Sequence, residues 1–216
     1  GETFAGLLRK NGISVGEVRR VHPGSTSTGD IIFIRHTPLQ HALRRSNINS
    51  HNLYAESLLK RIAASATSRP GTFDEGASVV ESAVIQRLGS YQTGLNVADG
   101  SGMSRQNKIS PRTLAMWLAS FGLQDPVGKA LLDSLATPGH GTLDNRFRNV
   151  DLQDGTIHAK SGYLRGVCAL SGYILHKDHA PLVFSIIVND INGDVKGAKK
   201  MQEAIVLAAI NYMGKK

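Results

Sequence analysis

The sequence predicts a mixed α/β (α+β) fold, in which an antiparallel sheet is flanked by helices on both faces and joined to a helical subdomain. Two segments near the C-terminus, 166–175 and 182–191, are apolar at both alternating positions, as strands covered by helices on both sides are. The short polar sequence 177–179 joins them as a hairpin. Ahead of them, 53–66 and 74–88 show the composition and spacing of helices.

The first part of the chain contains short elements. We expect, in order, a helix at 4–10 stopped by Asn11-Gly12, a candidate strand at 15–21, a loop at 23–29, a strand at 30–35, and a helix that Thr37-Pro38 opens and that runs to about residue 45.

The middle and end of the chain are expected to be more regular. The helix at 53–66 has one apolar face, made of Ala55, Leu58, Leu59, Ile62, Ala63 and Ala66. A loop at 94–105 and two further helices, 110–121 and 126–135, complete a mostly helical lobe over about 50–150. Residues 156–216 form the sheet and a closing helix, 197–213, whose expected buried face is Ala198, Met201, Ile205, Ala208, Ala209 and Tyr212. With no internal repeat or linker, we expect 1–216 to be a single unit.

The composition narrows the class of protein. The 216 residues are 41% hydrophobic and 19% charged, as in a soluble globular chain, and no apolar run could span a bilayer. Gly1 is not a typical native start, so we expect a mature or truncated product. The net charge of +8 comes from scattered basic pairs without interleaved aromatic residues, which argues against nucleic acid and fits an anionic cell-wall polymer equally well. Cys168 stands in an apolar strand and is expected to be a buried structural thiol.

Two short patterns carry candidate chemistry. Lys160-Ser161-Gly162 opens a predicted strand, where a cation and a hydroxyl could bind a carboxylate and the glycine leaves room for a substrate backbone. Ser50-His51-Asn52 stands just before the long helix, where Ser and Asn are also ordinary N-cap residues. By itself each pattern is also compatible with a purely structural role.

Together these patterns resemble a known family. Ser50-x-Asn52 followed 110 residues later by Lys160-Ser161-Gly162 is similar to the second and third motifs of active-site-serine penicillin-binding enzymes, whose motifs are S-x-x-K, S-D-N and K-T-G. The flanking segments 49–60, 99–105, 141–143 and 160–173 resemble the class C low-molecular-mass penicillin-binding proteins, the D-alanyl-D-alanine carboxypeptidase/endopeptidase family. The resemblance covers nearly the whole chain.

The resemblance implies a β-lactamase/transpeptidase-like fold, incomplete here at its N-terminus, and serine acyl transfer on peptidoglycan stem peptides ending in D-Ala-D-Ala. It also implies binding of β-lactams, a periplasmic or other extracytoplasmic location, and no metal or cofactor. The catalytic residues would be Ser50 (proton relay to the leaving amine), Asn52 (acyl side chain) and Lys160 (electrostatics of the relay). The substrate-binding residues would be Ser161, Gly162, Tyr163 (oxyanion N–H) and Met103 (apolar wall), whereas Thr142 and Arg146 would be structural.

Three departures from the family pattern stand out. His51 replaces the Asp of S-D-N, and Tyr163 replaces a hydroxyl residue, which weakens the expected grip on a substrate carboxylate. The nucleophile motif is the third. One formal S-x-x-K match exists, Ser57 to Lys60, but it lies within a predicted helix whose N–H groups are already used, so we expect Ser57 not to be catalytic. We therefore expect a C-terminal part of such an enzyme, inactive alone.

The alternatives are a non-catalytic cell-wall-binding or scaffold protein of the same fold and, more distantly, an esterase or β-lactamase relative. In this family the sheet has five strands, with the Lys-Ser-Gly strand at one edge. The strand 182–191 would then be left with one unpaired side, which we expect to pair with an N-terminal segment or a second chain.

Overall fold

The computed structural model describes residues 1–19, 34, 36–90 and 92–214, and the chain divides into two compact units, Gly1–His36 and Thr37–Lys216. This division differs from the sequence analysis, which predicts a single unit over 1–216. The first unit contains helix α1 (Glu2–Lys10). The predicted strand at 15–21 is wrong over its described part, 15–19, where the Arg9 side chain binds the carbonyl oxygens of Val15 and Gly16. The predicted loop 23–29 and nearly all of the predicted strand 30–35 lie outside the described residues.

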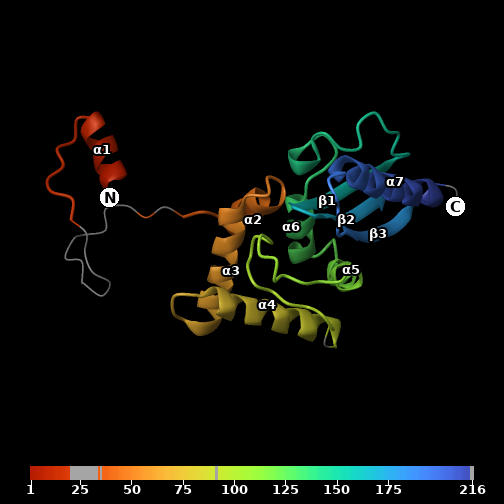
Figure 1. Cartoon of the computed structure of the whole chain (residues 1–216), viewed down its shortest axis with the longest axis horizontal. Helices are drawn as coiled ribbons and strands as arrows, with labels where there is room; N and C mark the ends of the chain where they lie inside the picture. The colour runs from red at the N-terminus through yellow and green to blue at the C-terminus, as the bar shows by residue number, and fades with distance from the viewer. Residues whose placement is uncertain (20–33, 35, 91, 215–216) are drawn as a thin grey trace. The chain divides into compact units, whose positions relative to one another are not determined.

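The second unit begins with a helical lobe (Figure 1). Its helices are α2 (Leu39–Asn47), α3 (Asn52–Thr67), α4 (Phe73–Leu88), α5 (Pro111–Ala119) and α6 (Pro126–Ser134), followed by a single 3₁₀ turn, η1 (Gly141–Leu143). Local sequence fixes the helix starts. Thr72 and Glu75 form a reciprocal capping box on α4, and Ser110 caps α5 ahead of a proline at its first position. The predicted helices of this lobe are confirmed to within two residues at their ends.

Within the described residues the sheet consists of three antiparallel strands in the order β1-β2-β3: β1 (Gly155–Leu164), β2 (Val167–His176) and β3 (His179–Val188). The predicted hairpin between the last two strands is confirmed. Among the described residues the Lys-Ser-Gly strand β1 is one edge of this sheet and β3 is the other. The last strand starts three residues earlier than predicted, so it includes Pro181, and it ends at Val188.

Helices cover both faces of the sheet, as the sequence predicts. The closing helix α7 (Val195–Met213) packs on one face, where its Val206 and Ile210 join Ile157, Leu170 and Ile174 in the main core. The opposite face carries a smaller core made by Leu118, Leu135 and Tyr173, which comes from the side of α5 and α6. Figure 1 shows this layered arrangement. The predicted fold class is therefore confirmed.

The predicted buried faces of two helices need correction. In α7 the buried residues are Gln202, Val206, Ile210 and Met213, whereas the predicted Met201, Ile205 and Tyr212 are exposed. The buried face is displaced by one position from the predicted one and includes a glutamine. The Gln202 amide donates to the backbone oxygen of Cys168, so its polar group is satisfied in the core. In α3 only Leu59 and Ala63 of the predicted face are fully buried. Cys168 is buried, as predicted.

Candidate active site

The loop that carries Ser50 is held by the turn η1. The backbone N–H of Thr142 donates to the carbonyl oxygen of Ile48 (2.9 Å), and Ile48 is buried. Gly141 has φ +63, and a Cβ there would lie 2.5 Å from the same carbonyl, so only glycine fits this approach. Ser50 itself has φ 53, a left-handed conformation that is uncommon for serine and that clusters at functional sites. The turn therefore fixes the position of the Ser50 hydroxyl.

The strand β1 begins at Gly155, so the Lys-Ser-Gly motif lies in its middle and not, as predicted, at its start, and there Lys160 lies beside the Ser50 hydroxyl. The Lys160 Nζ donates to Ser50 Oγ (2.9 Å) and also contacts the Ser161 carbonyl oxygen. Burial lowers the pKa of the Lys160 ammonium to about 8, because a low-dielectric environment disfavours the charged form. The strand is held on its outer side by two backbone hydrogen bonds between Ala136 and Ala159. An ammonium with a lowered pKa thus donates a hydrogen bond to a hydroxyl, and it could return a proton to that oxygen if the hydroxyl gave up its own.

The loop 98–107 contributes Ser101, Gly102 and Met103 to the lining of the same site, and hydrogen bonds within the loop hold its shape. The Asp99 carboxylate accepts hydrogen bonds from the backbone N–H groups of Gly102 and Ser104 and from the Asn107 amide. Gly100 donates to Glu56 of α3, which ties the loop to the helix that follows Ser50. Met103, within this loop, is 55% exposed.

One cavity of about 510 Å³ collects the residues that the sequence singles out. Its lining includes all seven of them: Ser50, Asn52, Met103, Lys160, Ser161, Gly162 and Tyr163. Apolar side chains of α5 and β2, among them Leu114, Leu118 and Val167, complete the walls. The structure therefore brings together residues more than a hundred positions apart, although the role of each stays a prediction.

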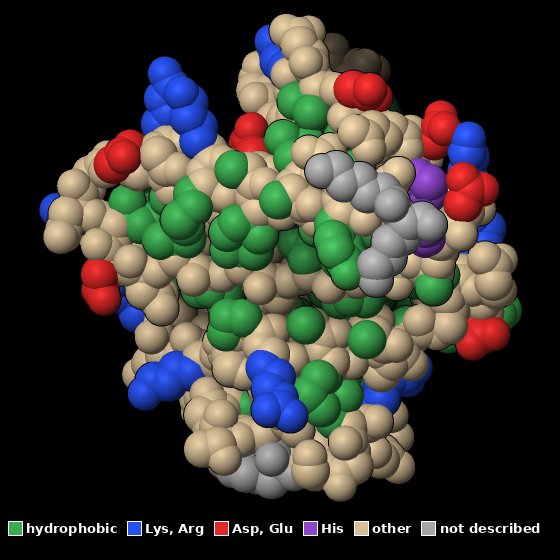
Figure 2. Space-filling view, turned by 90° about the vertical axis from the view of Figure 1, so that its right-hand side faces the viewer, with side chains coloured by type: hydrophobic (Ala, Val, Ile, Leu, Met, Phe, Trp, Pro, Cys, Tyr) green, Lys and Arg blue, Asp and Glu red, His purple; other side chains and the backbone are tan. Residues whose placement is uncertain are grey.

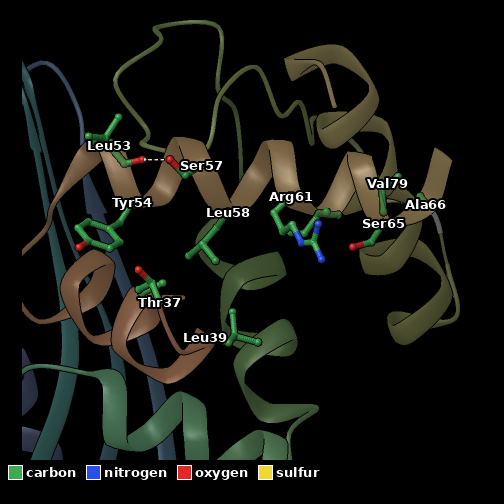
Figure 3. A pocket seen from close by; sticks show the side chains of 12 residues that line it. Thr37, Leu39, Leu53, Tyr54, Ser57, Leu58, Arg61, Ser65, Ala66 and Val79 are labelled. Carbon is green, nitrogen blue, oxygen red and sulfur yellow. Dashed lines mark hydrogen bonds between the residues drawn. The ribbon is translucent and has the colours of Figure 1, made fainter. Parts of the chain in front are cut away.

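The formal S-x-x-K match lies elsewhere. Ser57 is in the second turn of α3, and its hydroxyl donates to the carbonyl oxygen of Leu53 (2.7 Å) on the same helix. Figure 3 shows Ser57 and Leu53 beside a larger cavity of about 1050 Å³, whose lining also includes Leu58, Arg61 and Val79. The lining of this cavity includes none of the seven predicted site residues, so Ser57 does not face Lys160 in one site.

Sequence reasoning missed how closely the segment 141–146 approaches the site. Thr142 and Arg146 line a further cavity of about 180 Å³ together with Ser50, Ser161 and Gly162. The signal that could have found them is the glycine of Gly141-Thr142-Leu143, since a glycine in a tight turn often marks close backbone approach.

The fold places the chain among the penicillin-binding and β-lactamase-like proteins. Over 98% of this chain, with a TM-score of 0.72 and 25% identity, it is similar to penicillin binding protein 4 from Haemophilus influenzae, of which it covers 49%. A variant of a reconstructed ancestral class A β-lactamase has the same fold over 82% of the chain (TM-score 0.59, 15% identity, 66% of that chain covered).

Residues 1–212 match the D-Ala-D-Ala carboxypeptidase 3 (S13) family, and the chain belongs to this family. It is 36% identical over 171 residues to a D-alanyl-D-alanine carboxypeptidase of Actinomadura sp. strain R39, covering 76% of this chain and 30% of the relative. It is 30% identical over 195 residues to a carboxypeptidase of Mycolicibacterium smegmatis, covering 88% of this chain and 41% of the relative. The chain thus spans between about a third and two fifths of these relatives. Among the described residues no helix is long and apolar enough to cross a membrane.

Proposed function

We propose that this chain is part of a serine D-alanyl-D-alanine carboxypeptidase/endopeptidase that acts on peptidoglycan stem peptides through an acyl-enzyme and that binds β-lactams. The observation that carries the proposal is the hydrogen bond from Lys160 Nζ to Ser50 Oγ, in a cavity that also contains Asn52 and the exposed edge of β1. Membership of the family supports the reaction class. Residues 1–216 would be the C-terminal portion of the serine transpeptidase-like domain.

In this proposal the substrate backbone lies along the edge strand β1. An edge strand offers unpaired N–H and C=O groups to an extended peptide, which is how many domains hold peptides. The backbone N–H of Tyr163 would stabilise the oxyanion, and the Asn52 amide would bind the acyl side chain. Met103 would contact the substrate from the opposite wall, and Ser161 would bind its carboxylate.

Ser50 and Lys160 would move the proton to the leaving D-alanine. A general acid works best when its pKa is close to the working pH, and the pKa of about 8 for Lys160 meets that condition. The short contact lets Lys160 stabilise or protonate Ser50 while Ser50 protonates the amine. Water then hydrolyses the acyl-enzyme, which releases the shortened peptide.

The attacking serine would come from outside these 216 residues, so the chain would be inactive alone. The one S-x-x-K match is held within α3 and away from Lys160. A serine supplied by another segment or chain would have to enter the cavity beside Ser50 and Lys160.

The free side of β3 is where we propose that such a segment, or a second chain, pairs. Among the described residues β3 has a strand partner on one side, β2, and its apolar residues Leu182, Ile186 and Ile187 are only partly buried. Figure 2 shows hydrophobic side chains gathered on the face of the molecule seen from the right-hand side of Figure 1, where β3, α5 and α7 lie. A long apolar edge is an association site.

The substrate implies the location: peptidoglycan lies outside the cytoplasmic membrane, so we propose that the protein works in the periplasm or another extracytoplasmic space. The net charge of +8 is compatible with an anionic wall.

Purification of the native protein on immobilised penicillin tests this proposal against a non-catalytic scaffold. We expect retention, a native mass above the 23.2 kDa of this chain, and an additional S-x-x-K serine that carries the penicilloyl group. A native protein of 23.2 kDa that neither binds penicillin nor releases D-alanine would favour the scaffold.

A further inference from the structure

The segment 141–146 also lines a cavity that the proposed reaction does not use. This cavity has a volume of about 590 Å³, and the rest of its lining comes from the N-terminal half of α7, including Lys196, Lys199 and Lys200. Its lining contains none of the seven predicted site residues, Ser50 and Lys160 among them. We call this cavity the α7 pocket.

The three lysines of the α7 pocket lie on one side of their helix. Lys196, Lys199 and Lys200 are spaced at i, i+3 and i+4, so the turns of α7 bring them together. All three residues are exposed, and among the described residues none of them has a carboxylate within ion-pair distance. A stripe of this kind is by itself ordinary for the solvated face of an amphipathic helix.

Arg146 distinguishes this pocket from ordinary surface, because it is a buried cation with one unused nitrogen. The residue is 6% exposed, its Nε donates to Glu203 (2.8 Å), and its Nη2 donates to the carbonyl oxygen of Lys199 (3.0 Å) and to Gln202 (3.2 Å). Its Nη1 is buried and has no hydrogen-bond partner among the described residues. Since a buried donor left unpaired costs stability, Arg146 indicates a ligand in a pocket that it lines.

Thr142 lines the same pocket and supplies a second unsatisfied group. Its Oγ1 is buried without a hydrogen-bond partner in the described part of the chain, whereas its backbone N–H donates to Ile48. A charged nitrogen and a hydroxyl on one pocket can both bind the oxygen atoms of a single ligand.

The charge balance of the α7 pocket favours an anion. Its two acidic residues are Glu203, which is paired with Arg146, and Asp144, whose carboxylate lies 3.7 Å from Arg148. The three lysines therefore leave an excess of positive charge. The N-terminus of α7 adds nothing to this attraction, because the Asp194 carboxylate already caps it.

The hydrogen bonds of Arg146 favour a phosphate over a carboxylate. A carboxylate pairs best with two parallel N–H groups of a guanidinium, but two of the three nitrogens of Arg146 are already engaged within the protein. A phosphate has more acceptor oxygens, so it can accept from one guanidinium nitrogen, from the Thr142 hydroxyl and from several lysines at once. No aromatic side chain that could stack a base is among the described residues that line the pocket.

We propose that the α7 pocket binds the phosphate groups of a linear phosphodiester polymer that carries no bases. Thr142, Arg146 and Lys199 also line the small cavity that includes Ser50 and Ser161, so the polymer site adjoins the catalytic site. Binding there would hold the protein on an anionic surface while the edge strand β1 takes up a peptide. That this surface is the cell wall rests on the proposed function, whereas the binding itself does not.

Titration of the 216-residue chain with a short glycerol phosphate oligomer tests this inference. The comparison ligands are polyglutamate of equal charge and an oligodeoxynucleotide with the same number of phosphates. Amide chemical shifts of Thr142, Asn145 and Lys199 report binding at the pocket. We expect the oligomer to shift these amides and to bind roughly tenfold more tightly than polyglutamate. Equal affinity for polyglutamate, or shifts elsewhere in the chain, would overturn the inference, and tighter binding of the oligodeoxynucleotide would identify the ligand as nucleic acid instead.

Lys200→Gln and Lys108→Gln form a matched pair, because both remove one exposed positive charge and only Lys200 lines the pocket. We expect Lys200→Gln to weaken binding of the oligomer several-fold and Lys108→Gln to change it little. Equal losses in the two variants would show that only the net charge attracts the polymer, which would contradict a defined site.

Thr142→Val separates binding from stability. Because Thr142 Oγ1 makes no hydrogen bond in the described structure, the melting temperature should stay the same or rise slightly, while the affinity for the oligomer falls several-fold. Full affinity in this variant would remove Thr142 from the site and count against the pocket.

These readouts are independent of the nucleophile. Binding of the oligomer by a native protein that never labels with penicillin would support the pocket and contradict the proposed function. Penicillin labelling without binding of the oligomer would do the reverse.

Discussion

Lys160 and Ser50 are 110 positions apart, and the Nζ of one lies 2.9 Å from the Oγ of the other. Neither element alone brings them together: Lys160 is on β1, and Ser50 is on a loop that η1 holds through Ile48. The contact therefore depends on how the helical lobe packs against the sheet.

The 216-residue chain should form no covalent adduct with a fluorescent penicillin. Ser57, the one S-x-x-K match, donates its hydroxyl to Leu53 and lies outside the catalytic cavity. Intact mass after incubation measures the result, with Ser57→Ala as the matched control. A stoichiometric adduct that disappears in Ser57→Ala would show that α3 carries a nucleophile after all.

In the complete enzyme, Lys160→Met should reduce the acylation rate by roughly a hundredfold or more, the usual effect of removing a group that acts in the transition state. Stability should fall little, because the change removes a largely buried charge and keeps the packing volume. Stopped-flow labelling with penicillin, alongside urea unfolding, compares the two quantities. Wild-type labelling by a folded Lys160→Met protein would exclude Lys160 from catalysis.

The pKa of Lys160 also predicts a pH dependence of stability. Its folded pKa of about 8 is below the ordinary 10.5, so between these values the unfolded chain binds more protons than the folded one. The contribution of this residue to the free energy of unfolding should therefore rise from pH 8 to pH 10, by at most about 3 kcal/mol. Urea unfolding of wild type and Lys160→Met across this range isolates the effect.

A difference in the free energy of unfolding between wild type and Lys160→Met that does not change with pH would contradict the lowered pKa of Lys160. The contribution of Lys160 levels off near pH 10.5, the ordinary pKa of an unfolded lysine. Tyr173, whose pKa burial raises to about 12, acts in the opposite direction above pH 10, but it does so in both proteins and cancels from their difference.

Gly141→Ala should displace the Ser50 loop. Both Gly141 and Gly139 have positive φ, but a Cβ at Gly141 meets Ile48 whereas one at Gly139 has nothing within 4 Å. Gly139→Ala should cost about 1 kcal/mol of unfolding free energy from backbone strain alone, and Gly141→Ala about 1–3 kcal/mol more. Penicillin labelling of the complete enzyme should fall in Gly141→Ala only. Equal effects of both changes would show that contact with Ile48 is unimportant.

The free side of β3 should be protected only when a partner is present. Hydrogen exchange of 182–188 in the purified chain should be faster than that of the central strand β2, or else sedimentation should show a dimer. Adding the segment that carries the nucleophile should slow exchange in β3 and dissociate such a dimer. A monomer with both strands equally protected would mean that this edge is already closed.

The sequence by itself determined the class of fold and most helix boundaries, and it singled out seven residues that the structure places on the lining of one cavity. Apolar residues at both alternating positions indicated β2 and β3, and the helical spacing of apolar residues indicated α3 and α4. The motifs Ser50-x-Asn52 and Lys160-Ser161-Gly162 indicated the family. The signals for helices and strands are local, since the periodicity of apolar residues, the helix caps and the turn residues each depend on only a few neighbouring positions.

Only the tertiary structure decided which face of α7 is buried, because the burial of Gln202 depends on a hydrogen bond to Cys168 across the core. It also showed that Arg146, 14 positions before Lys160, has a buried nitrogen without a partner behind the Lys-Ser-Gly strand. Burial, pKa and unsatisfied donors depend on what surrounds a side chain in space. A sequence pattern records the residue types but not that environment.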